Sequence, residues 1–306
     1  MGGEEAKQIH DGDGNLTKSA CKGGESVENT PLPDGETLMG RRGNRRRNLY
    51  RMREIVTMAA ERLAAVILAA GKGVRMGADR PKVLLEACGR ALIGWVGDAA
   101  RRAGADLLVA VIGPEMTAEE KRKYLDGFVC VVQKERLGTG HAVLQAAPLI
   151  ADLESVLVLC GDVPCLRPAT LRSLVSLRLK EDVPAAVLTM FLDDPAGYGR
   201  ILRNANGDIT GIVEERDATE RERQIREVNS GTYVFRCRDL LETLPRIGCD
   251  NAQGEYYLTE VVRFLADEGK RVVGIAVDDV DEVRGVNTPE QLEAVRRILA
   301  TRAARK

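Results

Sequence analysis

The stretch LAAVILAAGKGVRM, residues 63–76, joins an apolar run to a glycine-rich loop. The run 64–69 has the length of a strand and no polar alternation, which is typical of a strand buried on both faces of a parallel sheet. Similar runs follow, with helical patterns between them. The runs lie at 107–112, 128–132 and 155–159, and the helical patterns at 92–103, 118–125, 139–150 and 169–180. This order predicts an α/β protein with a Rossmann-like, doubly wound sheet.

The pattern changes after residue 184. Two short runs, 198–203 and 208–213, flank Asn206-Gly207, a strong hairpin signal because both residues tolerate positive φ. The elements expected after this hairpin are helices at 217–224, 256–268 and 289–303 and strands at 228–236 and 272–277. Together the two halves predict a doubly wound mixed sheet, and no internal repeat is present.

Composition limits the classes of function. The 306 residues carry 45 Lys plus Arg against 46 Asp plus Glu, a net charge of −1, which gives no general attraction to nucleic acid or to a membrane. Seven scattered cysteines without a C-x-x-C pair, and only two histidines, argue against a zinc site. The sequence therefore predicts reduced thiols and a cytoplasmic protein, with no nucleic-acid partner and no membrane partner.

Residues 1 to about 57 lack periodicity and differ in composition from the rest. Such a stretch buries too little apolar surface to offset its chain entropy, so we expect a disordered leader at 1–60 and one folded domain at 61–306. The basic run 41–47 could instead be a nucleic-acid or targeting arm. A second hypothesis is that translation starts at Met58, just before the first strand.

The glycine-rich loop directly follows the first strand, where open α/β sheets bind their ligands. Gly71 and Gly73 would let the backbone approach a phosphate, and Arg75 and Lys82 would neutralise its charge. The spacing fits neither the P-loop nor the G-x-G-x-x-G pattern. Glycine richness alone favours a phosphate site no more than a tight structural turn.

The motifs that follow the loop resemble one known family. In order they are Pro81-Lys82, Gln133, 137–142 (LGTGHA), 161–164 (GDVP), 197–201 (GYGRI), 212–214 with Asp217-Ala218, 229–231, 251–259 (NAQGEYYLT) and 285–287. From about residue 63 to 297 the chain is similar to the uridylyltransferase domain of the bacterial bifunctional N-acetylglucosamine-1-phosphate uridylyltransferase/glucosamine-1-phosphate acetyltransferases. The resemblance implies a nucleotide-diphospho-sugar transferase fold and a nucleotidyltransferase domain over 61–306.

The resemblance also implies a set of site residues. Arg75 and Lys82 would stabilise the phosphates, while Asp162 and Asn287 would hold Mg²⁺. Nucleotide contacts would come from Leu68, Ala70, Gly71, Gly73, Gln133, Gly138 and Thr139. Gly199, Glu214, Asn229 and Asn287 would bind the sugar phosphate. Departures from the family pattern occur at Val74, where a hydroxyl residue is common, and at Cys160, where an aromatic residue is common.

Several of these residues also have plain structural interpretations. Asp162 could be a turn former, Gln133 a polar strand end and Thr139 a helix cap. His141 is interpreted as a helix residue near the nucleotide, because an anionic sugar phosphate needs no general base. Glu214 is expected to point inward and Glu215 outward, since neighbours on a strand alternate.

The implied reaction is uridylyl transfer from UTP to N-acetylglucosamine 1-phosphate, a step in peptidoglycan synthesis and cell wall biogenesis. The alternatives are a related nucleotidyltransferase with another sugar or base, and a non-catalytic nucleotide-sugar sensor. The resemblance includes no β-helix, so acetyl transfer is not predicted. The sequence does not define an oligomeric state.

Overall fold

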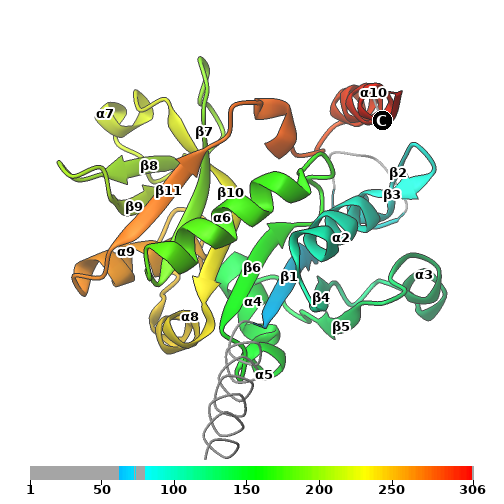
Figure 1. Ribbon diagram of the computed structural model, residues 1–306, viewed down its shortest axis with the longest axis horizontal. Coiled ribbons are helices and arrows are strands. Elements are labelled where there is room, and N and C mark those ends of the chain that lie inside the picture. Colours follow the sequence, from blue (N-terminus) through cyan, green and yellow to red (C-terminus); the bar gives the residue numbers. More distant parts are fainter. Residues whose placement is uncertain (1–61, 72, 74–79, 305–306) are drawn as a thin grey trace, which may run out of the picture. The chain divides into compact units, whose positions relative to one another are not determined.

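The computed structural model describes residues 62–71, 73 and 80–304. The expected leader at 1–60 and Arg75 lie outside these residues. Within them, one nine-stranded sheet has the order β11-β7-β10-β6-β1-β4-β5, and β8 pairs with both β10 and β9 (Figure 1). The predicted mixed sheet is therefore confirmed.

The sheet has a parallel part and an antiparallel part. The parallel part contains β1 (Leu63–Ala69), β4 (Leu107–Ile112), β5 (Val129–Val132) and β6 (Ser155–Cys160). The antiparallel strand β10 (Glu227–Arg236) separates β6 from β7 (Ala185–Phe191), and β11 (Val272–Ala276) runs parallel to β7. The remaining pair is the predicted hairpin of β8 (Arg200–Arg203) and β9 (Ile209–Val213).

Helices cover both faces of the sheet. In Figure 1, α2 (Leu92–Ala103) and α6 (Pro168–Lys180) lie in front of it. The opposite face is covered by α4 (Thr139–Gln145), α5 (Ala147–Ile150), α8 (Cys237–Thr243) and α9 (Thr259–Asp267). None of the described helices is long and apolar enough to cross a membrane.

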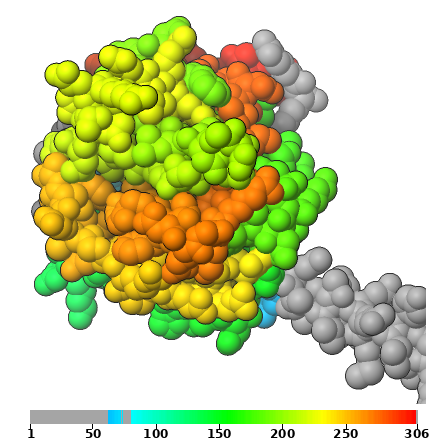
Figure 2. Space-filling model, turned by 90° about the vertical axis from the view of Figure 1, so that its left-hand side faces the viewer, coloured from blue at the N-terminus to red at the C-terminus, as the bar shows by residue number. Residues whose placement is uncertain are grey.

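The other elements lie around this core. α10 (Pro289–Ala304) packs on the short hairpin of β2 (Glu86–Ala87) and β3 (Arg90–Ala91). The small helices are α3 (Ala118–Tyr124), α7 (Glu220–Arg223), η2 (Lys82–Leu84), η3 (Leu244–Arg246) and η4 (Val280–Val283). Figure 2 shows a second face, where orange residues of α9 lie beside the yellow-green β8–β9 hairpin.

Strand β1 shows why the parallel part was predictable. Ala65 and Ile67 pack into the core under α2 and α6, whereas Ala64 and Val66 pack into the core under α4 and α9. All four are fully buried. A strand that loses water on both faces gains roughly 25 cal/mol for each Å² of apolar surface buried, and a polar side chain on either face would lose that gain.

Three predicted helices differ from the structure. The helix expected at 139–150 is two helices, because Pro148 lacks an amide proton and its ring collides with the preceding turn. The charged helix expected at 217–224 spans only Glu220–Arg223, after a capping box at Thr219. The helix expected from residue 256 starts at Thr259, because the Tyr256 backbone instead pairs with Leu137 and Gly140.

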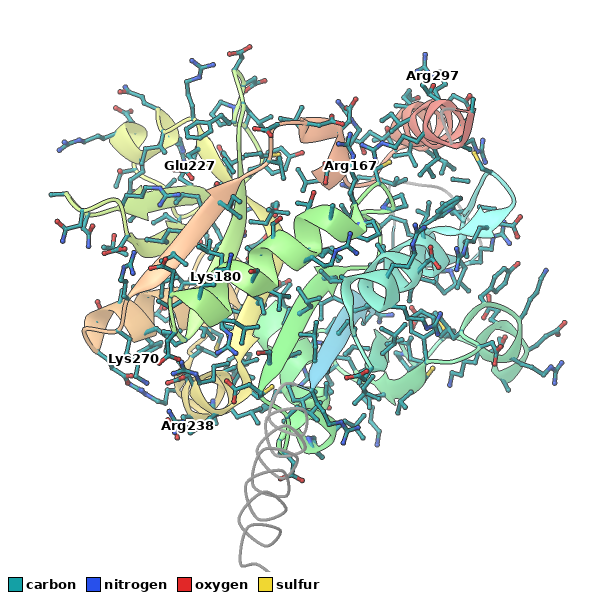
Figure 3. The ribbon with its side chains drawn as sticks, viewed as in Figure 1. Arg167, Lys180, Glu227, Arg238, Lys270 and Arg297 are labelled. Atoms are coloured by element: carbon teal, nitrogen blue, oxygen red, sulfur yellow. The ribbon has the colours of Figure 1, made fainter. Side chains whose placement is uncertain are left out.

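A buried carboxylate ties the antiparallel part together. Glu227, at the start of β10 (Figure 3), accepts hydrogen bonds from Arg203 of β8 at 2.6 and 2.7 Å and from Thr189 of β7 at 2.7 Å. Burial raises the pKa of the Glu227 carboxyl, but the hydrogen bonds from Arg203 and Thr189 outweigh burial and hold the pKa below its ordinary value. The ionised form therefore stabilises the junction of three strands.

Replacing this carboxylate should destabilise the fold. We expect Glu227→Gln to lower the free energy of unfolding at pH 7 by about 2 kcal/mol, because two bonds from a guanidinium lose their charged partner. A lowered folded-state pKa stabilises above the unfolded pKa, so the difference from wild type should vanish as pH falls through the folded pKa. Urea unfolding measures it. The exposed Glu293→Gln is the control, and equal effects would contradict this prediction.

Candidate functional site

A cavity of about 300 Å³ opens at the carboxyl ends of β1 and β6. Eight of its lining residues belong to the predicted nucleotide and metal set: Leu68, Ala70, Gly71, Lys82, Gln133, Gly138, Thr139 and Asp162. The others, which sequence reasoning did not assign to the site, are Val83, Arg136, Ala142, Cys160 and Glu255. The structure thus brings most of the predicted nucleotide half into one pocket.

The register of β1 and β6 brings the loop and Asp162 together. Leu68 pairs with Cys160, and the Gly161 amide then donates to the Leu68 carbonyl at 2.9 Å. A Cβ atom on Gly161 would lie only 3.0 Å from that carbonyl oxygen, so glycine favours the close approach. Asp162 follows at once. Its carboxylate therefore emerges beside the start of the glycine-rich loop.

Lys82, Asp162 and Asn287 converge on one point. The Lys82 Nζ atom lies 2.5 Å from Asp162 Oδ2 and 2.8 Å from Asn287 Oδ1. The Lys82 and Asp162 side chains are only 13% and 19% exposed, so water screens this ion pair weakly. Lys82 stands in η2, and its base packs against the loop, since a Cβ atom on Gly73 would lie 2.6 Å from Lys82 Cβ.

The two oxygen donors fit a magnesium ion. Mg²⁺ is usually held by one or two protein oxygens and completed by water and substrate phosphates. Asp162 and Asn287 offer one carboxylate and one amide oxygen around a point that already holds a positive charge. Among the described residues, no group of three or more His, Cys, Asp or Glu side chains is arranged to hold a metal alone. Phosphate oxygens would complete such a site.

The loop is positioned by an arginine that the sequence did not reveal. Arg136 Nε donates to the Ala70 carbonyl at 2.5 Å, and the same guanidinium pairs with Glu115. These bonds fix the backbone just before Gly71. Arg136 lies within a polar loop and outside every motif that marks the phosphate site, so no sequence signal distinguished it from a solvated charge. Arg75, the second predicted phosphate ligand, lies outside the described residues.

Gln133 and the 138–141 segment form the opposite wall. Gln133 is 3% exposed, and its Nε2 atom lies 3.0 Å from both the Gly138 carbonyl and His141 Nδ1. His141 stands in α4, as expected, and orients this amide. Thr139 is not the helix cap: Gly138 holds the cap position, and the Thr139 hydroxyl accepts from the Leu258 amide at 3.0 Å.

Gly199, Glu214 and Asn229 cluster at a neighbouring position. The Asn229 amide nitrogen donates to the Gly199 carbonyl at 2.8 Å, and a Cβ atom on Gly199 would lie 3.4 Å from Glu214 Oε2. Glu214 also accepts from the Thr259 hydroxyl at 3.1 Å. Glu215 points elsewhere and pairs with Arg200 at 2.8 Å. The predicted inward Glu214 and outward Glu215 agree with these contacts.

Burial leaves the Glu214 carboxyl less acidic than usual. Desolvation raises its pKa, the hydrogen bond from Thr259 opposes that rise, and the nearby carboxylates of Asp217 and Glu255 add to it. The polar atoms of Asn229 are oriented as well. Its Nδ2 donates to the Tyr233 hydroxyl at 2.6 Å, and its Oδ1 accepts from the Gly231 amide at 3.0 Å. Tyr233 is a positioning residue that the motifs did not indicate.

Cys160 lies between the two groups of residues. It lines the cavity, and its Sγ atom lies 3.6 Å from the Gly231 carbonyl, close to Asn229. Burial, together with the nearby Asp162 carboxylate, raises the pKa of the Cys160 thiol to about 12, so it stays a neutral thiol. The nucleotide-side pocket and the Gly199–Glu214–Asn229 cluster therefore adjoin through one small, uncharged side chain.

This geometry has known counterparts. A family described as the MobA-like NTP transferase domain matches residues 65–257, which is more than half of the chain. The chain belongs to this family. Membership places this MobA-like NTP transferase among the nucleotidyltransferases, as the motifs predicted.

Curated relatives confirm the resemblance drawn from the motifs. This NTP transferase is 43% identical over 247 residues to the bifunctional protein GlmU of Pelobacter propionicus, with 80% of this chain and 54% of the relative covered. Identity to the bifunctional protein GlmU of Geobacter metallireducens is 44% over 248 residues, with 80% and 52% covered. The chain thus spans about half the length of the curated relatives it matches.

A solved structure confirms the fold. A UDP-glucose pyrophosphorylase complexed with UDP-glucose superimposes with a TM-score of 0.64 at 20% sequence identity. The superposition covers 79% of this chain and 99% of that one. The predicted nucleotide-diphospho-sugar transferase fold is therefore correct.

The position of Gly138 provides a test of the pocket wall. Its φ is +109°, and a Cβ atom would lie 2.6 and 2.7 Å from the Tyr256 backbone oxygen and nitrogen. We expect Gly138→Ala to push this wall away from Gln133 and weaken binding of a nucleoside triphosphate at least tenfold, about 1.4 kcal/mol. Isothermal titration calorimetry measures it.

Gly104→Ala is the matched control for that variant. Gly104 has the same φ of +109° at the end of α2, but nothing lies within 4 Å of its Cβ position. The control should lose stability of about 1 kcal/mol from backbone strain and keep its affinity for the nucleoside triphosphate. Equal nucleotide affinities for the two variants would show that the wall does not contact the nucleotide.

Proposed function

We propose that this chain transfers a uridylyl group from UTP to N-acetylglucosamine 1-phosphate, releasing pyrophosphate and UDP-N-acetylglucosamine. One observation carries the proposal: Cys160 lines the cavity of Lys82 and Asp162 and also contacts Gly231, whose amide donates to Asn229 of the sugar-side cluster. Two anionic substrates can therefore lie side by side in one site. The identity to the bifunctional GlmU proteins supports this choice of sugar and base.

The reaction is a displacement at phosphorus that the protein assists by positioning and charge. An oxygen of the sugar phosphate attacks the α-phosphorus of UTP, in line with the departing pyrophosphate, and no covalent enzyme intermediate is needed. Lys82 stabilises negative charge on the phosphates, and Arg75 is assigned the same role. A bound Mg²⁺, held by Asp162 and Asn287, would neutralise phosphate charge and lower the repulsion between the two substrates.

The remaining residues select and orient the substrates. Gln133 and the Gly138–Thr139 backbone read the uracil edge. The Gln133 Nε2 atom is held by the Gly138 carbonyl and His141, so its Oε1 atom accepts from the base. Leu68, Ala70, Gly71 and Gly73 provide backbone contacts along the nucleotide. Glu214 and Asn229 hold the sugar hydroxyls and the acetamido group, with Gly199 leaving room beside them. We place the reaction in the cytoplasm, a proposal that the free thiols of the described cysteines support.

Turnover is the direct test. Pyrophosphate release measured over four nucleoside triphosphates and several sugar 1-phosphates should be highest for UTP with N-acetylglucosamine 1-phosphate. Release with another pair would favour the related nucleotidyltransferase, and no release with any pair would leave only the sensor.

We expect Asp162→Ala to lower kcat at least a hundredfold, because a preorganised charge at the phosphates is lost. The exposed Asp126→Ala should keep full turnover.

The raised pKa of Glu214 predicts a pH dependence of sugar binding. A carboxylate accepts hydrogen bonds from sugar hydroxyls and loses that capacity when it is protonated, so affinity should fall as pH drops through the raised pKa. At about pH 8, Glu214→Gln should raise the KM for the sugar phosphate roughly tenfold, as loss of bonds to a charged group implies.

Comparing the KM values of Glu214→Gln and wild type at each pH separates protonation of Glu214 from protonation of the substrate phosphate, which also titrates. The ratio of the two KM values should shrink toward acid pH, because wild type then carries a neutral carboxyl too. Glu220→Gln, an exposed change on α7, should give a ratio of one throughout. A ratio for Glu214→Gln that stays at one from about pH 5 to pH 8 would remove Glu214 from sugar binding. A ratio that is high but constant would contradict the predicted titration of its carboxyl.

A further inference from the structure

The oxygen donors around Lys82 are held in place without any metal. The Val286 amide donates to the Asp162 carbonyl at 3.0 Å, which ties the 285–287 turn to the end of β6. The Gln291 side chain accepts from the Asn287 amide nitrogen at 2.7 Å and from the Thr288 amide nitrogen at 3.1 Å. Two backbone segments therefore aim Asp162 Oδ2 and Asn287 Oδ1 at one point, and the Lys82 ammonium fills that point.

We propose that Lys82 is a placeholder for the divalent cation: its ammonium holds the metal ligands in the nucleotide-free protein and moves to phosphate oxygens when metal and nucleotide arrive. This proposal rests on the metal site assigned above. A single point between two oxygens cannot hold an ammonium and a divalent ion together, because like charges at that distance repel strongly. Metal coordination by both oxygens and their contact with Lys82 are therefore mutually exclusive.

The Lys82 side chain is suited to such a movement. Its base is fixed, because it belongs to η2 and packs against Gly73, while the ammonium is a point charge at the end of four flexible methylene groups. The Lys82 side chain is only 13% exposed. If its ammonium leaves the two oxygens, it has a buried charge without a partner unless another anion binds it. Both Lys82 and Gly71 line the same cavity, so phosphates bound at the loop would provide that anion.

The placeholder couples metal binding to nucleotide binding. Without nucleotide, a metal ion must displace Lys82 from both oxygens with no phosphate to receive it, so metal affinity is low. With nucleotide, the phosphates accept Lys82 and also coordinate the metal. Because coupling between two ligands is reciprocal, nucleotide raises metal affinity by the same factor as metal raises nucleotide affinity. Lys82 accounts for a large part of this mutual increase in affinity.

Binding of Mn²⁺, followed by the paramagnetic resonance signal of the free ion, tests the proposal without turnover. Lys82→Met should bind Mn²⁺ at least tenfold more tightly than wild type when no nucleotide is present. Adding UTP without sugar phosphate should raise Mn²⁺ affinity far less in Lys82→Met than in wild type. Lys82→Gln gives a second neutral variant if the methionine variant folds poorly, and circular dichroism checks the fold of each.

Two controls exclude simpler explanations. Arg136→Gln removes a nearby positive charge that does not contact Asp162 or Asn287, so its nucleotide-free Mn²⁺ affinity should stay close to wild type. An equal gain in that variant, or no gain in the Lys82 variants, would overturn the placeholder. The Asp162→Asn/Lys82→Met double variant should lose the gain, and its retention would also refute the proposal.

The outcome is separable from that of the proposed reaction. If the Lys82 variants gain Mn²⁺ affinity but no pair of nucleotide and sugar phosphate releases pyrophosphate, the placeholder stands and the uridylyltransferase assignment fails. If pyrophosphate is released and the Lys82 variants bind Mn²⁺ no more tightly than wild type, the reaction stands and the placeholder is wrong.

Discussion

The hydrogen bond from the Gly161 amide to the Leu68 carbonyl holds the site together, because it fixes the carboxyl ends of β1 and β6 side by side. The glycine-rich loop leaves one of these strands, and Asp162 follows the other. Glycine suits this approach, since a Cβ atom would lie only 3.0 Å from the carbonyl oxygen and would push the two strand ends apart by a few tenths of an ångström. If the two strand ends separated, Lys82 and Asp162 could not share an ion pair, and the loop would lose its neighbouring carboxylate.

The antiparallel direction of β10 explains how the Gly199–Glu214–Asn229 cluster reaches the same edge of the sheet. Parallel strands present their carboxyl ends there, but β10 runs antiparallel to β6, so its first residues lie at that edge. Glu227 anchors this start, and Asn229 follows two residues later. An irregularity between Asn229 and Thr232, with Gly231 at φ +75°, then brings the Gly231 carbonyl next to Cys160. A doubly wound half and an antiparallel half thus share one site.

Sequence alone predicted those parts of the structure that follow from burial and turn chemistry. The doubly buried strands β1, β4 and β6 were found within one residue at each end, and Asn206-Gly207 marked the β8–β9 hairpin. The family resemblance supplied the eight expected residues that line one cavity, and their contacts with a nucleotide stay a prediction. Long-range contacts were not predictable: nothing local shows that Tyr256 pairs with Leu137, or that Arg136 supports Ala70. Strand β7 was also missed, although it is equally apolar.

Lys82 and Asn287, which meet at the proposed cation site, are separated by 205 positions of the chain. Domains acquire structure from the N-terminus while synthesis proceeds, so β1, β4 and β6 can pair long before residue 287 leaves the ribosome. During that interval the Lys82–Asp162 pair lacks its third member, and the turn that carries Asn287 has not yet docked on β6. A nascent chain therefore carries most of a nucleotide pocket without a complete cation site. Assembly of the site therefore waits for the docking of a turn that lies far downstream of the glycine-rich loop.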